Sequence, residues 1–295
     1  MFDFRYHALS LVAVFLALAI GILLGATIGD SLVSDASKGL SSSLHGDVVN
    51  ARNDARQAHA ELNQRDKIIS EEFPTVVQNV LAGQRVAVVA TGSLPSNIES
   101  EVRQSVEVAG GAIDSVSTFD IPSQLDDLET AAQGRLPSAG TDPELVRQFG
   151  RRIGRSLVNA GDLTQQFHKA LPDAFRGDFQ GAASVVFYRS PPPDKEDPKQ
   201  KQLREAFEEG LAAGLGSAGV QTVGVEEQST DPSQVGWYGD HKMSSVDSVD
   251  LPGGRLALVF VLNGEKGKYG IKDTADAPLP KLPIGSGTAV GSLGG

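Results

Sequence analysis

The chain has 295 residues, with 26 Lys and Arg against 37 Asp and Glu, a formal net charge of −11, and no cysteine. This length is enough for one sizeable core with an added rod or anchor. The acidic balance argues against nucleic acid as a partner, because phosphate binding needs a clustered basic face. The missing cysteine excludes disulfides, a thiolate nucleophile, and Cys-based zinc or iron–sulfur sites.

The first strong pattern is an uncharged apolar run over residues 8–28. At about 1.5 Å per residue, it is long enough to span the roughly 30 Å hydrocarbon core of a bilayer. Arg5 precedes the run and Asp30 follows it, so we expect residues 1–7 in the cytoplasm and the rest of the chain outside. A cleaved signal peptide is the alternative, but the run exceeds the usual apolar length of about 7–15 residues. We therefore predict a retained, single-pass transmembrane helix.

Small residues repeat every four positions at the end of this run, at Gly21, Gly25 and Gly29. This spacing lets two membrane helices approach closely and indicates dimerisation. Residues 30–73 then predict a coiled-coil rod, which Pro74 would end. Its a/d positions alternate by four and three residues: Leu44, Val48, Ala51, Ala55, Ala58, Leu62, Arg65 and Ile69. The alternative is a lone amphipathic helix packed on the following domain.

Residues 84–272 predict an extracytoplasmic α/β domain, because short apolar runs alternate with helical patterns. We expect a three-layer, Rossmann-like domain with a mostly parallel sheet. Residues 120–142 and 226–254 are predicted as loops, and the Gly- and Pro-rich residues 277–295 as a disordered tail. The expected strands are 85–90, 112–119, 183–188, 220–225 and 255–262, and the expected helices are 97–109, 143–159, 162–171 and 198–215.

The sequence gives only weak evidence for ligand sites in this domain. The turn Thr91, Gly92 and Ser93 follows the first strand and could receive an anion, although a plain strand-to-helix turn explains it better. His241 and Met243 offer an imidazole and a thioether, which suit Cu(I), although a recognition loop or a loop packed on the core is the preferred interpretation.

Four arginines, Arg147, Arg151, Arg152 and Arg155, form a basic patch on one predicted helix. The patch could meet an anionic envelope polymer, but pairing with nearby acids is the preferred interpretation. The sequence contains no G-x-S-x-G, HExxH, GxGxxG or GxxxxGK[ST] motif, so we expect no enzyme activity.

The order of these parts resembles a known family. The opening MFDFRYHALSLVAVFLALAIGILLGATIGDSL, the strand RVAVVATG, and the late segments SSVD (244–247), GRLALV (254–259) and APLP (277–280) carry the similarity. They resemble the actinobacterial copper transporter family, typified by the mycobacterial copper transport protein B. The resemblance implies copper efflux or homeostasis at the cell envelope, with copper as the metal and an outer-membrane location for some members.

The residues themselves imply no cofactor and suit a second hypothesis. Cu(I) carriers usually offer Cys and Met, whereas this chain has no Cys and one internal Met. Related corynebacterial proteins act with a cytoplasmic partner in cell division and envelope assembly. The second hypothesis is therefore a homodimeric scaffold or sensor with a cytoplasmic or envelope protein partner.

Overall fold

The computed structural model describes residues 4–135, 139–193 and 195–281, with side chains from 6–25 and from 44 onward. The chain divides into two compact units, residues 1–65 and 66–295. The predicted Gly29 lies in the part whose side chains are outside this description. The tail beyond residue 281 also lies outside the described residues.

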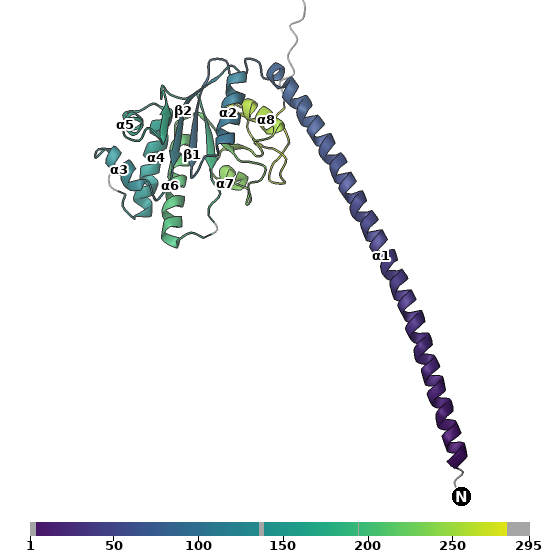
Figure 1. The fold of residues 1–295 in the computed structure, drawn as a ribbon. Helices are drawn as coiled ribbons and strands as arrows, with labels where there is room; N and C mark the ends of the chain where they lie inside the picture. Colours follow the sequence, from purple (N-terminus) through teal and green to yellow (C-terminus); the bar gives the residue numbers. More distant parts are fainter. Residues whose placement is uncertain (1–3, 136–138, 194, 282–295) are drawn as a thin grey trace, which may run out of the picture. The chain divides into compact units, whose positions relative to one another are not determined.

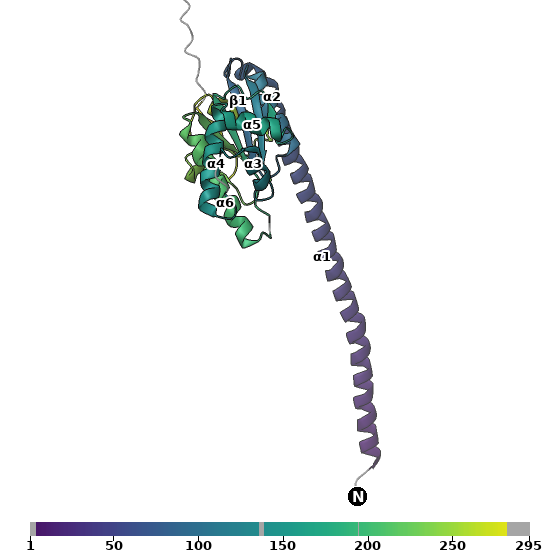
Figure 2. The same cartoon turned by 90° about the vertical axis from the view of Figure 1, so that its left-hand side faces the viewer.

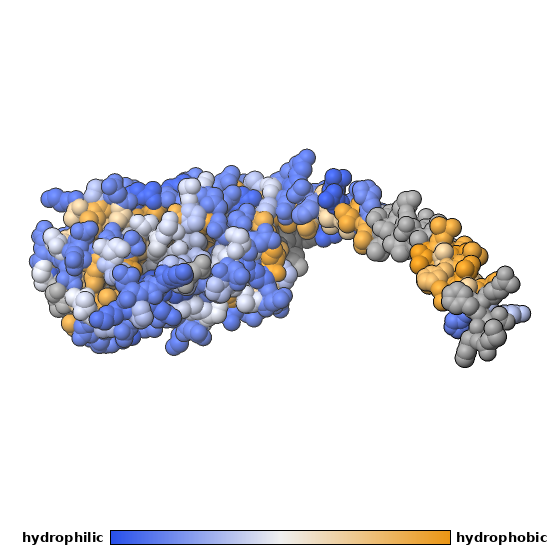
Figure 3. Space-filling model, turned by 60° about the horizontal axis from the view of Figure 1, so that its bottom comes forward, coloured by the Kyte–Doolittle hydropathy of each residue, from blue (hydrophilic) through white to orange (hydrophobic). Residues whose placement is uncertain are grey.

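The described N-terminal part of the chain is a single helix, α1 (Phe4–Val76). Within the described residues, one helical segment, Tyr6–Gly25, is long and apolar enough to cross a membrane. Its position near the N-terminus fits a single-pass anchor or a signal sequence. Figure 3 shows its apolar side chains as an orange region on the face of the helix in view.

Seven strands form one sheet in the order β3-β2-β1-β4-β5-β6-β7, and all neighbours are parallel except β2 and β3. This confirms the predicted α/β class with a mostly parallel sheet. Along β1, Ala87 and Val89 enter one core while Val86, Val88 and Ala90 enter the other. The strands are β1 (Arg85–Thr91), β2 (Ala112–Phe119), β3 (Phe175–Gly177), β4 (Ser184–Arg189), β5 (Gln221–Val225), β6 (Ser244–Val246) and β7 (Lys268–Tyr269).

Helices cover both faces of the sheet, which explains why its strands are continuously apolar. One core contains residues of α3 (Leu125–Ala131), α4 (Pro143–Val158), α5 (Asp162–Ala170), α6 (Pro198–Ser217) and α7 (Val235–Asp240). The other contains residues of α2 (Ser96–Val108) and α8 (Pro252–Leu262). Figures 1 and 2 both show α4 and α6 side by side.

The prediction of a strand at 255–262 is wrong, because this segment belongs to α8. Pro252 lies in the first turn, where its fixed φ and missing N–H favour a helix start. The predicted loop at 120–142 contains α3, and the predicted loop at 226–254 contains α7 and β6. These elements are short, so their patterns are weak in the sequence.

Pro74 does not end the first helix, which continues to Val76. Proline removes one N–H donor from the helix, but the backbone continues past it, and the Val77 amide donates to the Phe73 carbonyl at 3.0 Å. At the other end of the domain, the predicted tail from residue 277 begins too early. Ala277 still pairs with Tyr269, and its carbonyl accepts from the Gly270 amide at 3.0 Å.

Candidate functional site

The carboxyl ends of the parallel strands meet at one edge of the sheet, where ligands of α/β domains usually bind. The strand order changes direction at β1, which lies between β2 and β4. A cavity of 260 Å³ opens there, and Thr91, Asp120, Ser190 and Arg204 are among its lining residues. This cavity is the place in the fold that a small ligand would occupy.

The predicted turn after β1 enters this cavity only in part. Thr91 and Gly92 line it, whereas Ser93 does not. The Gly92 amide already donates to the Phe119 carbonyl at 2.8 Å, so it is not free to bind an anion. The buried Thr91 Oγ1 has no hydrogen-bond partner, which makes this hydroxyl the polar group of the turn that is open to a ligand.

A buried chain of ion pairs forms one wall of the cavity. The Arg204 guanidinium donates one hydrogen bond to each carboxylate oxygen of Glu196, at 2.9 and 2.8 Å, and a third to Glu208 at 3.1 Å. Glu208 also pairs with Arg189 at 2.8 Å. Hydrogen bonding to Arg204 lowers the pKa of Glu196, and the same contact raises the pKa of Arg204. The charges of this wall are thus balanced by ion pairs between residues of the protein itself.

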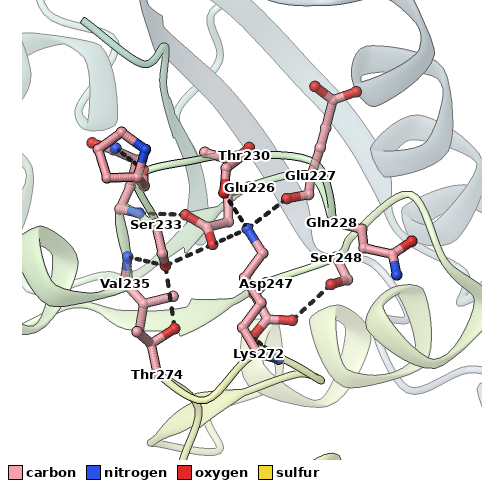
Figure 4. Close-up of polar contacts among 12 residues, drawn as sticks. Glu226, Glu227, Gln228, Thr230, Ser233, Val235, Asp247, Ser248, Lys272 and Thr274 are labelled. Carbon is pink, nitrogen blue, oxygen red and sulfur yellow. Dashed lines mark hydrogen bonds and ion pairs between the residues drawn. The ribbon is translucent and has the colours of Figure 1, made fainter. Parts of the chain in front are cut away.

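A second group of buried charges follows β5 and β6 (Figure 4). The ammonium of Lys272 contacts Glu226 Oε1 at 2.7 Å, the Thr230 carbonyl at 2.8 Å and the Glu227 carbonyl at 2.9 Å. Asp247, which has no solvent exposure, accepts hydrogen bonds from the Ser248 hydroxyl at 2.8 Å and from two backbone amides of the C-terminal segment. The C-terminal segment is thereby fastened to the edge of the sheet.

The two groups are joined by Gln234. Its side-chain oxygen accepts from Arg189, and its backbone N–H donates to Glu226. Tyr238 lies between them and donates its hydroxyl to the Val225 carbonyl at 2.9 Å; burial raises its pKa. Burial also raises the pKa of Tyr188 to about 12, with the charges of the acids after β5 adding to the effect. Internal hydrogen bonds therefore engage the charged groups that end or follow β4, β5 and β6.

His241 and Met243 both line a separate cavity of 650 Å³ near the opposite, amino-terminal ends of β5 and β6. The His241 ring stacks on Trp237 at 3.9 Å between centroids, and its Nδ1 donates to the Trp237 carbonyl at 2.8 Å. In a neutral imidazole that carries its proton on Nδ1, Nε2 has a lone pair that can bind a metal. Met243 is 7% exposed and packs into the core. The geometry thus agrees with the packing interpretation and leaves one imidazole nitrogen for a soft metal.

The donor set is small for a resident copper site. Within the described residues, no group of three or more His, Asp or Glu side chains is placed to hold a metal ion. His241 and Met243 supply two ligands of suitable softness, whereas the carboxylates of Glu196, Glu208 and Glu226 at the sheet edge are paired with Arg or Lys.

The four arginines of the predicted basic patch have different surroundings in the structure. Arg147 pairs with Glu209 at 2.9 Å and with Glu144, which raises the pKa of Arg147. Arg151, Arg152 and Arg155 are exposed and lie together on the surface of a groove beside α5. Pairing with acids therefore explains Arg147 but not the other three arginines.

Among the residues whose side chains the structure describes, most of the predicted association residues of α1 are exposed to solvent. The side chains of Leu44, Val48 and Leu62 are 55%, 47% and 54% exposed. Gly21 and Gly25 have open space around them. The remaining seam residues at Ala51, Ala55, Ala58 and Arg65 are also exposed, while Ile69 is half-buried.

Sequence reasoning missed the buried charges at the sheet edge. One signal was present, because Arg189 and Glu226 directly follow the predicted strands 183–188 and 220–225. Their partners are distant in the sequence, as with Glu226 and Lys272. Spacing alone therefore does not identify the pairs.

Two comparisons with known proteins bear on the identity of the chain. A search of curated proteins finds no match. The family model described as "Copper transport outer membrane protein, MctB" matches residues 1–280. The match covers both the apolar N-terminal helix and the α/β domain. The chain therefore belongs to the MctB family of copper transport outer membrane proteins.

Proposed function

We propose that this chain serves copper homeostasis as a membrane-anchored, dimeric scaffold. Two copies pair along α1, the N-terminus lies in the cytoplasm, and the Rossmann-like α/β heads lie on the other side of the membrane. The role is non-catalytic, and copper is handled together with a cytoplasmic or envelope protein partner. Family membership supports the link to copper, and the exposed seam of α1 supports the dimer.

The seam is the observation that carries this proposal. Leu44, Val48 and Leu62 expose about half of their side-chain surface, at the spacing of a heptad a/d face. Apolar side chains repeated on one helix face gain free energy when a second helix covers them. Ala51, Ala55 and Ala58 between them would allow close contact along a coiled coil.

The charges across the seam favour a parallel pair at one position. Asp47 and Arg52 occupy g and e positions, five residues apart, so each Asp47 would face Arg52 of the other copy. Glu61 and Asp66 would repel each other at the equivalent positions nearer the head. The association is therefore expected to depend chiefly on the apolar seam.

The internally paired charges at the sheet edge support a scaffold over a carrier. The ion pairs that link Arg189, Glu208 and Arg204 occupy the charged groups that would otherwise bind a substrate or a metal. In addition, one apolar helix cannot enclose an ion path by itself. Direct copper passage would need several copies and a further set of ligands.

The test compares Leu62→Glu with Ala60→Glu in the full-length protein in detergent. Both positions are exposed, but Ala60 lies at the f position, away from the seam. We expect light scattering to give a dimer for the parent protein and for Ala60→Glu, and a monomer for Leu62→Glu. Cells carrying Leu62→Glu should also become copper-sensitive. A monomeric parent protein would refute the dimer.

A copper-binding measurement separates the scaffold from a direct carrier. Cu(I) titration of the full chain is compared with the double variant His241→Ala, Met243→Leu. The scaffold predicts no stoichiometric, tight binding by either protein. Tight binding that the double variant loses would instead favour transport through the head.

A further inference from the structure

A groove on the surface of the head is lined by four arginines, in a protein whose net charge is −11. It lies where α4 contacts α5, and Figure 2 shows these helices close together. The groove has a volume of 570 Å³. Arg151, Arg152 and Arg155 come from α4, and Arg135 comes from the segment after α3. We call this feature the arginine groove.

Most of the positive charge in the arginine groove is not neutralised by the protein. Arg135 pairs with Asp162 at 3.0 Å, and Arg155 Nε donates to the neutral Ser217 hydroxyl at 3.3 Å. In the part of the chain that the structure describes, no carboxylate lies within ion-pair distance of Arg151 or Arg152. Three of the four guanidinium groups therefore lack an acidic partner.

Arg147, on the same helix, is paired with acids and serves as a comparison for the arginines of the groove. Arg147 lies one turn before Arg151 and contacts both Glu144 and Glu209. Acidic residues outnumber basic ones in the chain, so acids were available to pair with the later arginines as well. Grouped like charges repel each other, and a bound anion would remove that cost.

We propose that the arginine groove binds a ligand with several linked phosphate groups. A guanidinium presents a planar set of donors that matches two phosphate oxygens at once. Arg151 and Arg155 are one helical turn apart, with roughly 5–6 Å between their Cβ atoms. That spacing suits neighbouring phosphates of one ligand better than a single phosphate, which one or two arginines would satisfy.

Inorganic tripolyphosphate is the probe for this site, with the full-length protein in a neutral detergent. Isothermal titration is expected to show saturable binding, and monophosphate at the same ionic strength should bind roughly tenfold or more weakly. Citrate is included because it carries three carboxylates without phosphate. Binding of citrate as tight as that of tripolyphosphate would overturn the assignment to phosphates.

The variants decide whether the arginine groove is the site. Arg151→Gln with Arg155→Gln should weaken tripolyphosphate binding by roughly tenfold or more, since two charge-assisted contacts are lost. Arg147→Gln is the matched control, because it removes one charge from the same helix outside the groove. Circular dichroism verifies that the variants are folded. Equal affinity in all variants, or no saturable binding by the parent protein, would overturn the proposal.

Discussion

At the scale of single residues, Lys272 makes several of the contacts that hold the C-terminal segment at the sheet edge. Its ammonium contacts the carboxylate of Glu226 and two backbone carbonyls, and Glu226 has no solvent exposure. A buried carboxylate without a cation is strongly destabilising, whereas the pair is tolerated because each partner is hydrogen-bonded. The Lys272 amide also donates to Asp247 at 3.1 Å, so this residue links two buried acids.

We predict that Lys272→Met lowers the free energy of unfolding by about 3 kcal/mol, because Glu226 is left buried without its cation. The second variant, Lys272→Met with Glu226→Gln, should recover at least half of that loss, since a neutral amide has a smaller desolvation penalty. Urea unfolding of the full chain, followed by the fluorescence of Trp237, measures both changes. Trp237 is the single tryptophan and lies in the head, so the signal reports on this domain.

Lys266→Met serves as the control for this substitution. Lys266 is exposed, and its side chain makes no ion pair with the described residues. Its removal should change the free energy of unfolding by no more than about 0.5 kcal/mol. If Lys266→Met and Lys272→Met had equal effects, the contact with Glu226 would not be the cause.

At the scale of secondary-structure elements, the contact between α4 and α6 is unusually close because glycines meet backbone. A Cβ atom on Gly210 would lie 2.0 Å from the Arg147 carbonyl oxygen. Gly214, one turn later, faces the Arg151 carbonyl in the same way. The same small-xxx-small spacing that we predicted for close contact between membrane helices thus allows close contact between α4 and α6 in the α/β head.

Gly210→Ala should destabilise the head by about 3 kcal/mol, since the backbone of α4 cannot move away without disturbing the core. Gly216→Ala on the same helix is the matched control, because its Cβ would meet open space. That change should stabilise the helix by about 0.5–1 kcal/mol. Opposite signs in urea unfolding are expected. A shift of the same sign for both variants would contradict the packing argument.

The elements that could be predicted from the sequence are those with a clear period or clear ends. Helix α6 starts after Asp197, whose side chain accepts from the Lys199 amide, and Pro198 occupies its first turn. By contrast, α8 was predicted as a strand because it is apolar on every side. Its residues from Leu256 to Leu262 are all buried, so no polar face reveals the helical period.

The candidate site was less predictable than the fold for a related reason. Strand β6 has three residues, two of them serines, and no apolar period marks it. Without β6, the position of Asp247 at the sheet edge does not follow from the sequence. The contact between Glu226 and Lys272 depends on the segment after β7, and β7 itself pairs with β6.

At the scale of the whole molecule, the composition makes the topology testable. The chain has no cysteine, so any single cysteine introduced by mutation is the only thiol that a maleimide can label. Gln202 is exposed on α6 and provides such a position in the head. Asp3 provides one before the apolar segment Tyr6–Gly25.

We predict that Gln202→Cys is labelled by a membrane-impermeant maleimide and that Asp3→Cys is not. The cells are treated so that the outer envelope is permeable while the cytoplasmic membrane stays sealed. The expected difference follows from Arg5 before the apolar segment, because flanks rich in Lys and Arg stay in the cytoplasm. Detergent lysis should make both cysteines reactive. Labelling of Asp3→Cys alone in sealed cells would reverse the orientation, and loss of the Asp3→Cys peptide from the mature protein would show that the segment is a cleaved signal.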